Sequence, residues 1–384
     1  MTVEEPGSAA HILRLVSTGE AMSRSDLARV LGVARSTASL RVQELIDAGL
    51  VSETGEGPSR GGRRPRLLRP RTDGGFALAA DLGTRHVRVG AMTPARELVH
   101  TAAYELDIAA GPDAVLTELR SIAADFTSHE GLAGRRLIGV GVGLPGPVDA
   151  GRVSGPSRMP GWHGYSVEAR LAEAFGVPVT VDNDANIVAL GEYHARGREH
   201  ETLLVVKAGT GIGSGLVSSG VVHRGAHGVA GDVSHVRVSA AGELPCSCGN
   251  TGCLETVASG AALLDTLRDK GMDVESTKRI AELAADADPS VTSLVRFAGR
   301  GLGEVLSTVV NFVNPHAVLL YGRLATIEPY VAAVRGALYE RCLPIVTQDL
   351  EIGVAAAGVD AGVLGAGLLA LRHALATTDR KDRP

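Results

Sequence analysis

Two stretches of the chain, far apart in the sequence, repeat one plan. Residues 76–92, FALAADLGTRHVRVGAM, and residues 202–220, TLLVVKAGTGIGSGLVSSG, each read as two apolar strands around a glycine turn. Strands and helical patterns alternate after each of them, which is typical of α/β architecture. The repeat predicts an internal duplication, with a cleft between two α/β lobes. Backbone N–H groups of such turns can hold phosphate, although many tight turns are rich in glycine for steric reasons alone.

The length and the beginning of the chain limit its class. The 384 residues are enough for two or three domains. The first residues, MTVEEPGSAA, are acidic and lack the basic start and apolar stretch of a secretory signal, and no apolar run approaches membrane-spanning length. We therefore expect a cytoplasmic protein with no membrane partner.

The net charge of −5 is unevenly distributed. Residues 1–70 hold ten Arg or Lys against eight Asp or Glu, while the rest of the chain holds 28 against 35. The segment GPSRGGRRPRLLRPR, residues 57–71, carries six arginines and no acidic residue. A solvated linker, which is the alternative, usually mixes its signs, so this run predicts contact with phosphates.

The segment before the arginine run has the pattern of three short helices. A first apolar helix covers residues 11–17, and Ser23 with Asp26 forms a capping-box pattern that opens a second helix, which Gly32 ends. A longer third helix is expected over about residues 35–48. The buried positions predicted for the second and third helices are Leu27, Val30, Leu31, Val33, Ala38, Val42, Leu45 and Leu50.

Such a helix pair is a helix-turn-helix, and the arginine-rich hairpin after it has the place and charge of a wing. A small helical bundle with a solvated polar face is the alternative for the helices alone. Polar side chains at the start of the third helix are of the kind that reach base edges and phosphates in a major groove. The DNA-contacting residues predicted are Arg35, Ser36, Thr37, Ser39 and Arg41 on the helix and Arg60, Arg63, Arg64 and Arg66 on the wing.

Three of the four cysteines, Cys246, Cys248 and Cys253, lie within eight residues and shortly after His235. In a reducing compartment clustered cysteines are more often metal ligands or catalytic thiols than disulfides. Three thiolates and one imidazole would make a closed tetrahedral metal site with no position for water, which is structural rather than hydrolytic. Free cysteines beside a chance histidine are the alternative. The fourth, Cys342, lies in an apolar helical stretch and is expected in a core.

The order of the motifs resembles the ROK family of sugar kinases and sugar-responsive repressors. The motifs are PGPVD at 145–149, PGW at 160–162, DNDAN at 182–186, GTGIGSG at 209–215 and CSCGNTGCLE at 246–255. With a helix-turn-helix in front, the chain looks like the repressor branch. The resemblance implies an actin-like, ribonuclease-H-like pair of α/β lobes over residues 75–375, an all-α winged helix-turn-helix domain at 1–70 and a disordered tail at 376–384.

Residue by residue, the resemblance implies one structural zinc ion held by His235, Cys246, Cys248 and Cys253. It also implies sugar contacts from Asn183, Asp184, Asp232, His235 and Glu255. Carboxylates and amides suit this work because a hexose offers adjacent hydroxyls that donate and accept in pairs. In a kinase of the family, Asp184 would be the base that takes the proton from the attacking sugar hydroxyl. The alternative for Asp184 is a carboxylate that stabilises the N-terminus of the following helix.

The sequence departs from the family pattern at the first phosphate loop, which usually reads Asp-x-Gly-Gly-Thr. Here Thr84 and Arg85 would crowd an approaching phosphate, unless the arginine pairs with it. ATP binding is therefore doubtful. Asp232 replaces the family's glutamate and Ser234 replaces a glycine, so the ligand need not be glucose. The phosphate-loop residues, read as eroded or vestigial, are Asp81, Gly83, Gly209, Thr210, Gly211 and Gly213.

Two functions fit these features. One is a DNA-binding regulator, a repressor of carbohydrate uptake or catabolism genes, that senses a sugar or sugar phosphate. The other is an ATP-dependent, glucokinase-like sugar kinase that retains Asp184. The arginine wing and the altered Asp81 loop favour the non-catalytic regulator. One recognition helix reads few bases, so we expect a homodimer or homotetramer on duplex operator DNA.

Overall fold

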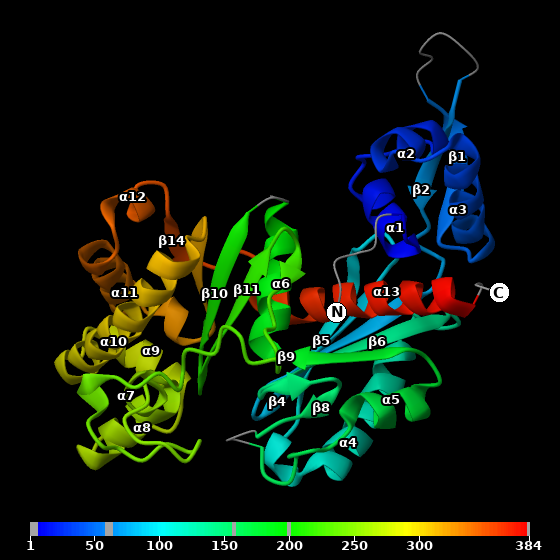
Figure 1. Cartoon of the computed structure of the whole chain (residues 1–384). Helices are drawn as coiled ribbons and strands as arrows, with labels where there is room; N and C mark the ends of the chain where they lie inside the picture. Colours follow the sequence, from blue (N-terminus) through cyan, green and yellow to red (C-terminus); the bar gives the residue numbers. More distant parts are fainter. Residues whose placement is uncertain (1–6, 58–63, 156–158, 198–200, 382–384) are drawn as a thin grey trace. The chain divides into compact units, whose positions relative to one another are not determined.

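The chain divides into two compact units, each built from more than one segment (Figure 1). The computed structural model describes residues 7–57, 64–155, 159–197 and 201–381. The helix-turn-helix segment falls within the first unit. The first unit consists of Met1–Gly143, Ser166–Val181 and Ala366–Pro384, and the second of Leu144–Tyr165 and Asp182–Gly365.

A five-stranded sheet in the first unit surrounds β3 (Phe76–Leu82), which is buried at every position. Its sequence, FALAADL, is nearly continuous in apolar and small residues, as expected for a strand that is covered on both faces. β3 pairs antiparallel with β4 (His86–Met92) and parallel with β6 (Leu137–Leu144). The sheet order is β5 (Leu98–Glu105), β4, β3, β6 and β9 (Val179–Asn183).

The second unit repeats this sheet. β10 (Thr202–Ala208) pairs antiparallel with β11 (Ile212–Ser218) and parallel with β13 (Ala317–Tyr321). The order β12 (Val221–Val222), β11, β10, β13 and β14 (Glu351–Val354) matches the first sheet strand for strand. The predicted duplication and both glycine hairpins are confirmed, and the two mixed sheets are consistent with the predicted actin-like fold.

The helix that follows the last strand of each sheet joins the other unit. α6 (Asp184–Arg196) follows β9 but packs on β10 and β11, and α13 (Ala361–Lys381) follows β14 but belongs to the first unit from Ala366 onward. The other helices have the bounds α4 (Pro112–Thr127), α5 (Val167–Phe175), α7 (Glu255–Ala258), α8 (Gly260–Asp269), α9 (Thr277–Ala285), α10 (Pro289–Val313), α11 (Glu328–Arg341) and α12 (Pro344–Thr347). Short strands β7 (Val148–Asp149) and β8 (Arg152–Val153) and the 3-10 turns η1 (Ile108–Ala110), η2 (Ser239–Ala241), η3 (Leu324–Thr326) and η4 (Gly358–Asp360) complete the described elements.

The amino-terminal segment contains the three predicted helices and a hairpin. α1 (Ala9–Ser17), α2 (Arg24–Leu31) and α3 (Arg35–Asp47) precede β1 (Val51–Glu56) and β2 (Arg66–Pro70), which pair antiparallel. The prediction of an all-α domain is therefore corrected. The reason is that the chain before the arginine run and the second half of the run itself, Arg66–Pro70, are extended and pair as a β-hairpin in the predicted place of the wing.

The predicted ends of the second helix are confirmed, whereas α1 begins at Ala9, two residues before the predicted start. Ser23 accepts the backbone N–H of Asp26 at the start of α2, and Gly32 ends α2 with a φ of 65°. The predicted core residues Leu27, Ala38, Val42, Leu45 and Leu50 are buried.

Two residues predicted in this core are instead at the surface. Val30 is 41% exposed and Val33 is 36% exposed. The buried residues of α2 are Leu27 and Ala28, so its apolar stripe is narrower than the sequence pattern indicated. Val33 lies in the turn before α3, outside the packed face.

The last helix corrects two further predictions. α13 includes residues 376–381, which were predicted to be a disordered tail, and its Leu375 is buried in the core of the helix-turn-helix segment. Residues 382–384 lie outside the described residues. The helical window Gly358–Thr377 is long and apolar enough to pass for a membrane span by length and composition, contrary to the sequence analysis, but 67% of it is buried as in a core helix.

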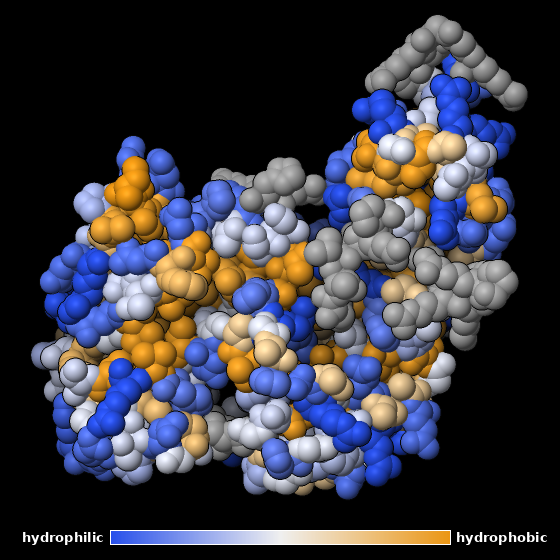
Figure 2. All heavy atoms as spheres, in the orientation of Figure 1, coloured by the Kyte–Doolittle hydropathy of each residue, from blue (hydrophilic) through white to orange (hydrophobic). Residues whose placement is uncertain are grey.

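One surface of the second unit is apolar. Large side chains on the ends of α10 and α11 and on α12 are exposed, and Figure 2 shows hydrophobic residues where Figure 1 labels α12. Phe312, near the end of α10, is 90% exposed, and Leu343 and Ile345, before and in α12, are also exposed. The backbone under them is held by Asn311, which donates to the carbonyl of Arg341 and accepts the N–H of Leu343. Exposed apolar surfaces of this kind are typical of protein–protein contacts.

Glycines allow the backbones of α6 and α13 to touch within the second unit. A Cβ atom on Gly191 would lie 1.9 Å from the carbonyl oxygen of Ala361, and one on Gly365 would lie 1.8 Å from that of Ile187. Both neighbours are backbone atoms, which cannot rotate away as a side chain can. The two positions therefore require glycine.

We predict that Gly191→Ala lowers the free energy of unfolding by about 1–3 kcal/mol or more, because the new methyl group overpacks a backbone contact. Gly336→Ala is the matched control, since Gly336 also lies inside a helix and nothing lies within 4 Å of the site of its Cβ. Alanine there should leave stability unchanged or raise it by about 0.5–1 kcal/mol through helix propensity. Urea unfolding curves measure both effects. Equal midpoints for Gly191→Ala and the wild type would contradict the close crossing.

Candidate functional site

The predicted metal ligands come together in the second unit. One ligand atom from each of His235, Cys246, Cys248 and Cys253 lies within 4.8 Å of all the others. The loop that carries them is folded by the isolated bridges Arg237↔Cys253 and Pro245↔Thr251 and by a hydrogen bond from the N–H of Cys246 to the carbonyl of Asn250. Gly249, between Cys248 and Asn250, has a φ of 92°, a conformation that favours glycine.

The distances in this cluster fit a tetrahedral zinc ion. The Sγ atoms of Cys248 and Cys253 are 3.7 Å apart, and the Sγ of Cys246 is 3.5 Å from the Nδ1 of His235. Zinc bonds of about 2.3 Å to sulfur and about 2.0–2.1 Å to nitrogen would put tetrahedral ligands about 3.8 Å (S to S) and about 3.6 Å (S to N) apart. A disulfide would need about 2.05 Å between sulfurs. The donor set is therefore compatible with zinc.

The thiols differ in their surroundings. Burial, followed by the neighbouring thiols of Cys248 and Cys246, raises the pKa of Cys253 to about 12. Burial also acts to raise the pKa of the Cys248 thiol, but hydrogen bonds from the backbone of Asn250 and from the other thiols outweigh it, and the net shift is downward. A thiolate at Cys253 needs a cation beside it, which a metal ion would supply.

The motif DNDAN forms the junction between β9 and α6. Asp182 is buried and accepts from the N–H of Asn183, the side-chain amide of Asn186 and the guanidinium of Arg224. This network fixes the turn that carries the two predicted sugar contacts.

Asn183 is the N-cap of α6. Its Oδ1 accepts the N–H groups of Ala185 at 2.9 Å and Asn186 at 3.3 Å, and its Nδ2 donates to the carbonyl of Gly146 at 3.1 Å. The side chain predicted to bind sugar thus already caps a helix, and its second amide hydrogen is the donor that these contacts leave for a ligand.

Asp184 is the first residue of α6. Its position is therefore the one expected under the alternative given above, a carboxylate that stabilises the N-terminus of a helix. Its carboxylate is nevertheless not held by the helix alone. Lys207 Nζ, on β10, donates to Asp184 Oδ2 at 2.7 Å. Lys207 was not among the predicted site residues.

Glu255 links the cysteine loop to the second glycine hairpin. It begins α7, two residues after Cys253, and its Oε2 accepts the N–H of Ile212 at 3.0 Å. The N–H of Glu255 donates to the carbonyl of Ser234. Burial, and then the charge of Glu255, raises the pKa of Tyr330 well above its usual value. Glu255 therefore holds the hairpin in place.

Asp232 is exposed, and its Oδ1 accepts both the N–H and the hydroxyl of Ser234. The two residues that depart from the family pattern thus bond to each other. The carboxylate is bound to its own turn through one oxygen.

The second glycine loop is held by its neighbours. The carbonyl oxygens of Gly209 and Thr210 accept the N–H groups of Gly260 and Ala261 at the start of α8. The Cβ position of Gly209 is open, whereas a Cβ on Gly215 would meet the carbonyl oxygen of Ala185 at 2.6 Å. The loop therefore has a fixed backbone with open space at its tip.

The first glycine loop, which contains Gly83 in the first unit, is covered by a side chain that was not predicted to lie there. Arg85, predicted to crowd it, is exposed. The imidazole of His86 lies there instead, since a Cβ on Gly83 would be 2.4 Å from His86 Cε1. Asp81 is buried in β3. The ring, rather than the guanidinium, occupies the space beside this glycine.

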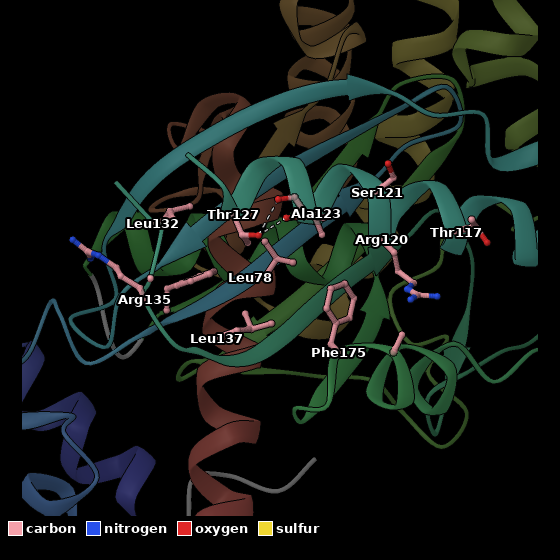
Figure 3. A pocket seen from close by; sticks show the side chains of 14 residues that line it. Leu78, Thr117, Arg120, Ser121, Ala123, Thr127, Leu132, Arg135, Leu137 and Phe175 are labelled. Carbon is pink, nitrogen blue, oxygen red and sulfur yellow. Dashed lines mark hydrogen bonds between the residues drawn. The ribbon is translucent and has the colours of Figure 1, made fainter. Parts of the chain in front are cut away.

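A hollow of about 710 Å³ lies in the first unit, between α4 and the end of α5 (Figure 3). It is lined by Leu78, Leu137 and Phe175, with Arg120 and Arg135 among its polar residues. None of the predicted site residues that the structure describes lines it, and we assign no chemistry to it.

The residues predicted to contact DNA are largely accessible where they are described. Arg35, Ser36 and Thr37 are exposed at the start of α3, while Ser39 and Arg41 are half-buried. On the hairpin, the side chains of Arg64 and Arg66 are 65% and 71% exposed. Arg60 and Arg63 lie outside the described residues.

Comparison with known proteins gives a consistent result. A model of the ROK family matches residues 77–373, and a helix-turn-helix model matches residues 8–54. The xylose repressor of Bacillus spizizenii is 28% identical over 95% of this chain and 94% of its own length. A glucokinase of Halalkalibacterium halodurans is 30% identical over 76% of this chain and 94% of its own. A crystal structure of a ROK family transcriptional regulator, a homologue of the Escherichia coli Mlc protein, has 26% identity and a TM-score of 0.80, covering 96% of both chains.

The metal cluster generates a prediction of one zinc ion per chain. Cys248→Ser should lower both the zinc content and the melting temperature, because loss of one ligand weakens a structural site that contributes to folding. Cys342→Ala is the control, since this cysteine is buried near Ser307 and away from the cluster, and it should leave the zinc content unchanged. Elemental analysis of freshly purified protein and thermal melting measure the two effects. Fully folded wild-type protein without metal would refute the assignment.

Proposed function

Because the chain belongs to the ROK family, we propose from this premise that it is a sugar-responsive, DNA-binding transcriptional repressor of the cytoplasm. The observation that carries the proposal is the helix-turn-helix at the start of the chain. The xylose repressor and the Mlc homologue match 95% and 96% of this chain, whereas the glucokinase matches 76% of it. The genes regulated would be those of carbohydrate uptake or catabolism.

In the proposed DNA interface, α3 enters the major groove and the hairpin contacts the backbone of duplex operator DNA. Arg35, Ser36 and Thr37 are the exposed side chains that would reach base edges, with Ser39 and Arg41 beside them. The wing arginines would meet phosphates, because their ion pairs with Glu53 and Glu56 are long, at 3.8–3.9 Å, and leave the guanidinium groups in solvent.

A symmetric oligomer follows from this interface, because two recognition helices double the number of bases contacted. The exposed apolar surface of Phe312, Leu343 and Ile345 supports self-association, with a second copy of the chain as its occupant. We propose a homodimer or a homotetramer.

The proposed sugar site consists of Asn183, Asp184, Asp232, His235 and Glu255, all in the second unit. A zinc ion on Nδ1 of His235 would leave Nε2 as the protonated nitrogen, a donor for a sugar hydroxyl. Zinc would also fix Cys253, and through the chain the position of Glu255. Structural zinc and sugar binding are in this way parts of one site.

The alternative function, an ATP-dependent sugar kinase, is favoured by Asp184 and by the open tip of the second glycine loop. The first loop argues against it, since His86 occupies the space beside Gly83. Phosphoryl transfer depends chiefly on positioning and neutralising the transferred group, so a base without its phosphate cradle contributes little. We propose that the protein is not an enzyme.

The DNA interface predicts different effects for its two parts. Arg64→Ala with Arg66→Ala should weaken binding to all duplexes and reduce the slope of log K against log [salt] by about 2, because two phosphate contacts are lost. Arg35→Ala should instead cost about 1–3 kcal/mol on the preferred sequence and relax that preference. The probe is a duplex selected by the wild-type protein from a random pool, and the control is Arg279→Ala on α9. Gel shifts in which both interface variants bind like the control would contradict the proposal.

The absence of kinase activity is tested by ADP release with Mg-ATP and D-glucose, D-xylose or N-acetyl-D-glucosamine. The wild type should show no turnover above the background of Asp184→Asn, and ATP should bind weakly. His86→Ala should raise nucleotide affinity because it clears the space beside Gly83, whereas Arg85→Ala, which removes an exposed side chain, should not. Robust turnover that disappears in Asp184→Asn would make the protein an enzyme and the proposal wrong.

A further inference from the structure

Leu40 is an exposed apolar residue in the middle of α3. Its side chain is 62% exposed, although the other apolar residues of this helix, all of which the structure describes, are buried or half-buried. A single exposed leucine is normal on a protein surface and needs no explanation by itself. Its place on the proposed recognition helix, however, decides which kind of molecule it would meet.

The helical repeat places Leu40 opposite the packed face of α3. The buried residues of the helix are Ala38, Val42 and Leu45. At about 100° per residue, Leu40 lies on the other side of the helix, one turn after Ser36 and Thr37. Both of these hydrogen-bonding residues are exposed. Leu40 therefore extends the exposed face with which α3 is proposed to enter the major groove.

The helix is basic at its start and acidic at its end. Arg35 is exposed at the first position, whereas Glu44 and Asp47 are exposed in the last turns. Arg41 donates to Glu44 at 3.3 Å, so its charge is partly matched within the helix. The phosphates of duplex DNA attract the basic end and repel the acidic one. They therefore favour the approach of the first half of α3, which runs from Arg35 to Leu40.

The major groove offers a leucine a single kind of apolar partner. Every base pair presents hydrogen-bonding groups there, and thymine alone adds a methyl group. A leucine against the edge of a G·C pair would instead separate those polar groups from water without bonding to them, which is unfavourable. Ser36 and Thr37 can bond to more than one kind of base, so the apolar side chain carries the sharper preference.

We propose that Leu40 is a specificity-determining residue, whose side chain contacts the 5-methyl group of a thymine in the major groove of the operator. This inference rests on the proposed DNA-binding function and adds to it a residue outside the predicted contacts and the base that this residue reads. The wing arginines hold the helix on the duplex through phosphates, while Leu40 selects thymine at one position of each half-site.

The test is a deoxyuridine scan of the duplex that the full-length wild-type protein selects from a random pool. Each thymine is replaced in turn by deoxyuridine, which removes the 5-methyl group and keeps the base pair, and binding is measured by fluorescence anisotropy. Wild-type binding should weaken about 4-fold at one thymine of each half-site, which corresponds to about 0.8 kcal/mol for one buried methyl group. Leu40→Ala should bind the thymine and deoxyuridine duplexes equally. Leu40→Met, which keeps an apolar side chain, should retain the difference.

Val359→Ala is the matched control for removal of an exposed apolar side chain. Val359 is 67% exposed in the second unit and belongs to none of the proposed sites, so this variant should keep the wild-type dependence on the methyl group. Leu40→Ala should melt at the wild-type temperature, because alanine favours a helix at least as well as leucine and the leucine is exposed. Its change in binding is then an effect on the contact with DNA.

The outcomes separate this inference from the function on which it rests. Wild-type binding that no deoxyuridine weakens, or a methyl dependence that persists in Leu40→Ala, would overturn the inference alone. A wild-type protein that selects no duplex from the pool would overturn the proposed DNA binding and this inference with it.

Discussion

The contact of α6 with backbone atoms is the constraint on which the second unit depends. On one side of α6, Gly213 and Gly215 of β11 pack against Ala185. On the other side, Gly191 packs against the first turn of α13. Both contacts are too close for a larger residue at these glycines. Buried Glu192 adds to this by accepting the N–H groups of Ala356 and Ala357. The axis of α6 is therefore fixed by steric contact with main chain. Its N-terminus carries Asn183 and Asp184, and their positions follow from the same packing.

A second set of covalent and hydrogen-bonded links fixes the other side of the site. Cys253 belongs to the metal cluster, Glu255 follows two residues later, and its carboxylate binds the N–H of Ile212 at the tip of the β10–β11 hairpin. Ile212 precedes Gly213, which packs on α6. The cysteine cluster is thus connected through Glu255 to the glycine hairpin, and the hairpin through Gly213 to the N-terminal turn of α6. In the proposed zinc-bound protein, loss of the metal would free the loop that carries Glu255 and, with it, one support of the glycine hairpin.

The features that the sequence predicted depend on residues close together in the chain. Ser23 and Gly32 bound α2 through contacts within three or four residues, the two hairpins follow from apolar runs around glycine, and the cysteine cluster follows from its spacing. The features it missed depend on sheet register and packing. Nothing local indicates that Lys207 faces Asp184, that Arg24 on α2 binds the carbonyl of Ser39 and the carboxylate of Glu53, or that Val33 stays outside the core. A lysine in an otherwise apolar strand was the one available signal for Lys207.

The last helix, α13, belongs to both units: its first turn lies in the second unit and the rest lies in the first. α13 occupies after β14 the place that α6 occupies after β9, and like α6 it leaves its own sheet. Its first turn, up to Gly365, packs on α6 in the second unit, and Leu375 near its other end is buried in the core of the helix-turn-helix segment. Gly365 packs so closely against the backbone of Ile187 that no side chain fits between α6 and this turn. One continuous helix thus contributes to the core of each unit, through Gly365 in the second and Leu375 in the first.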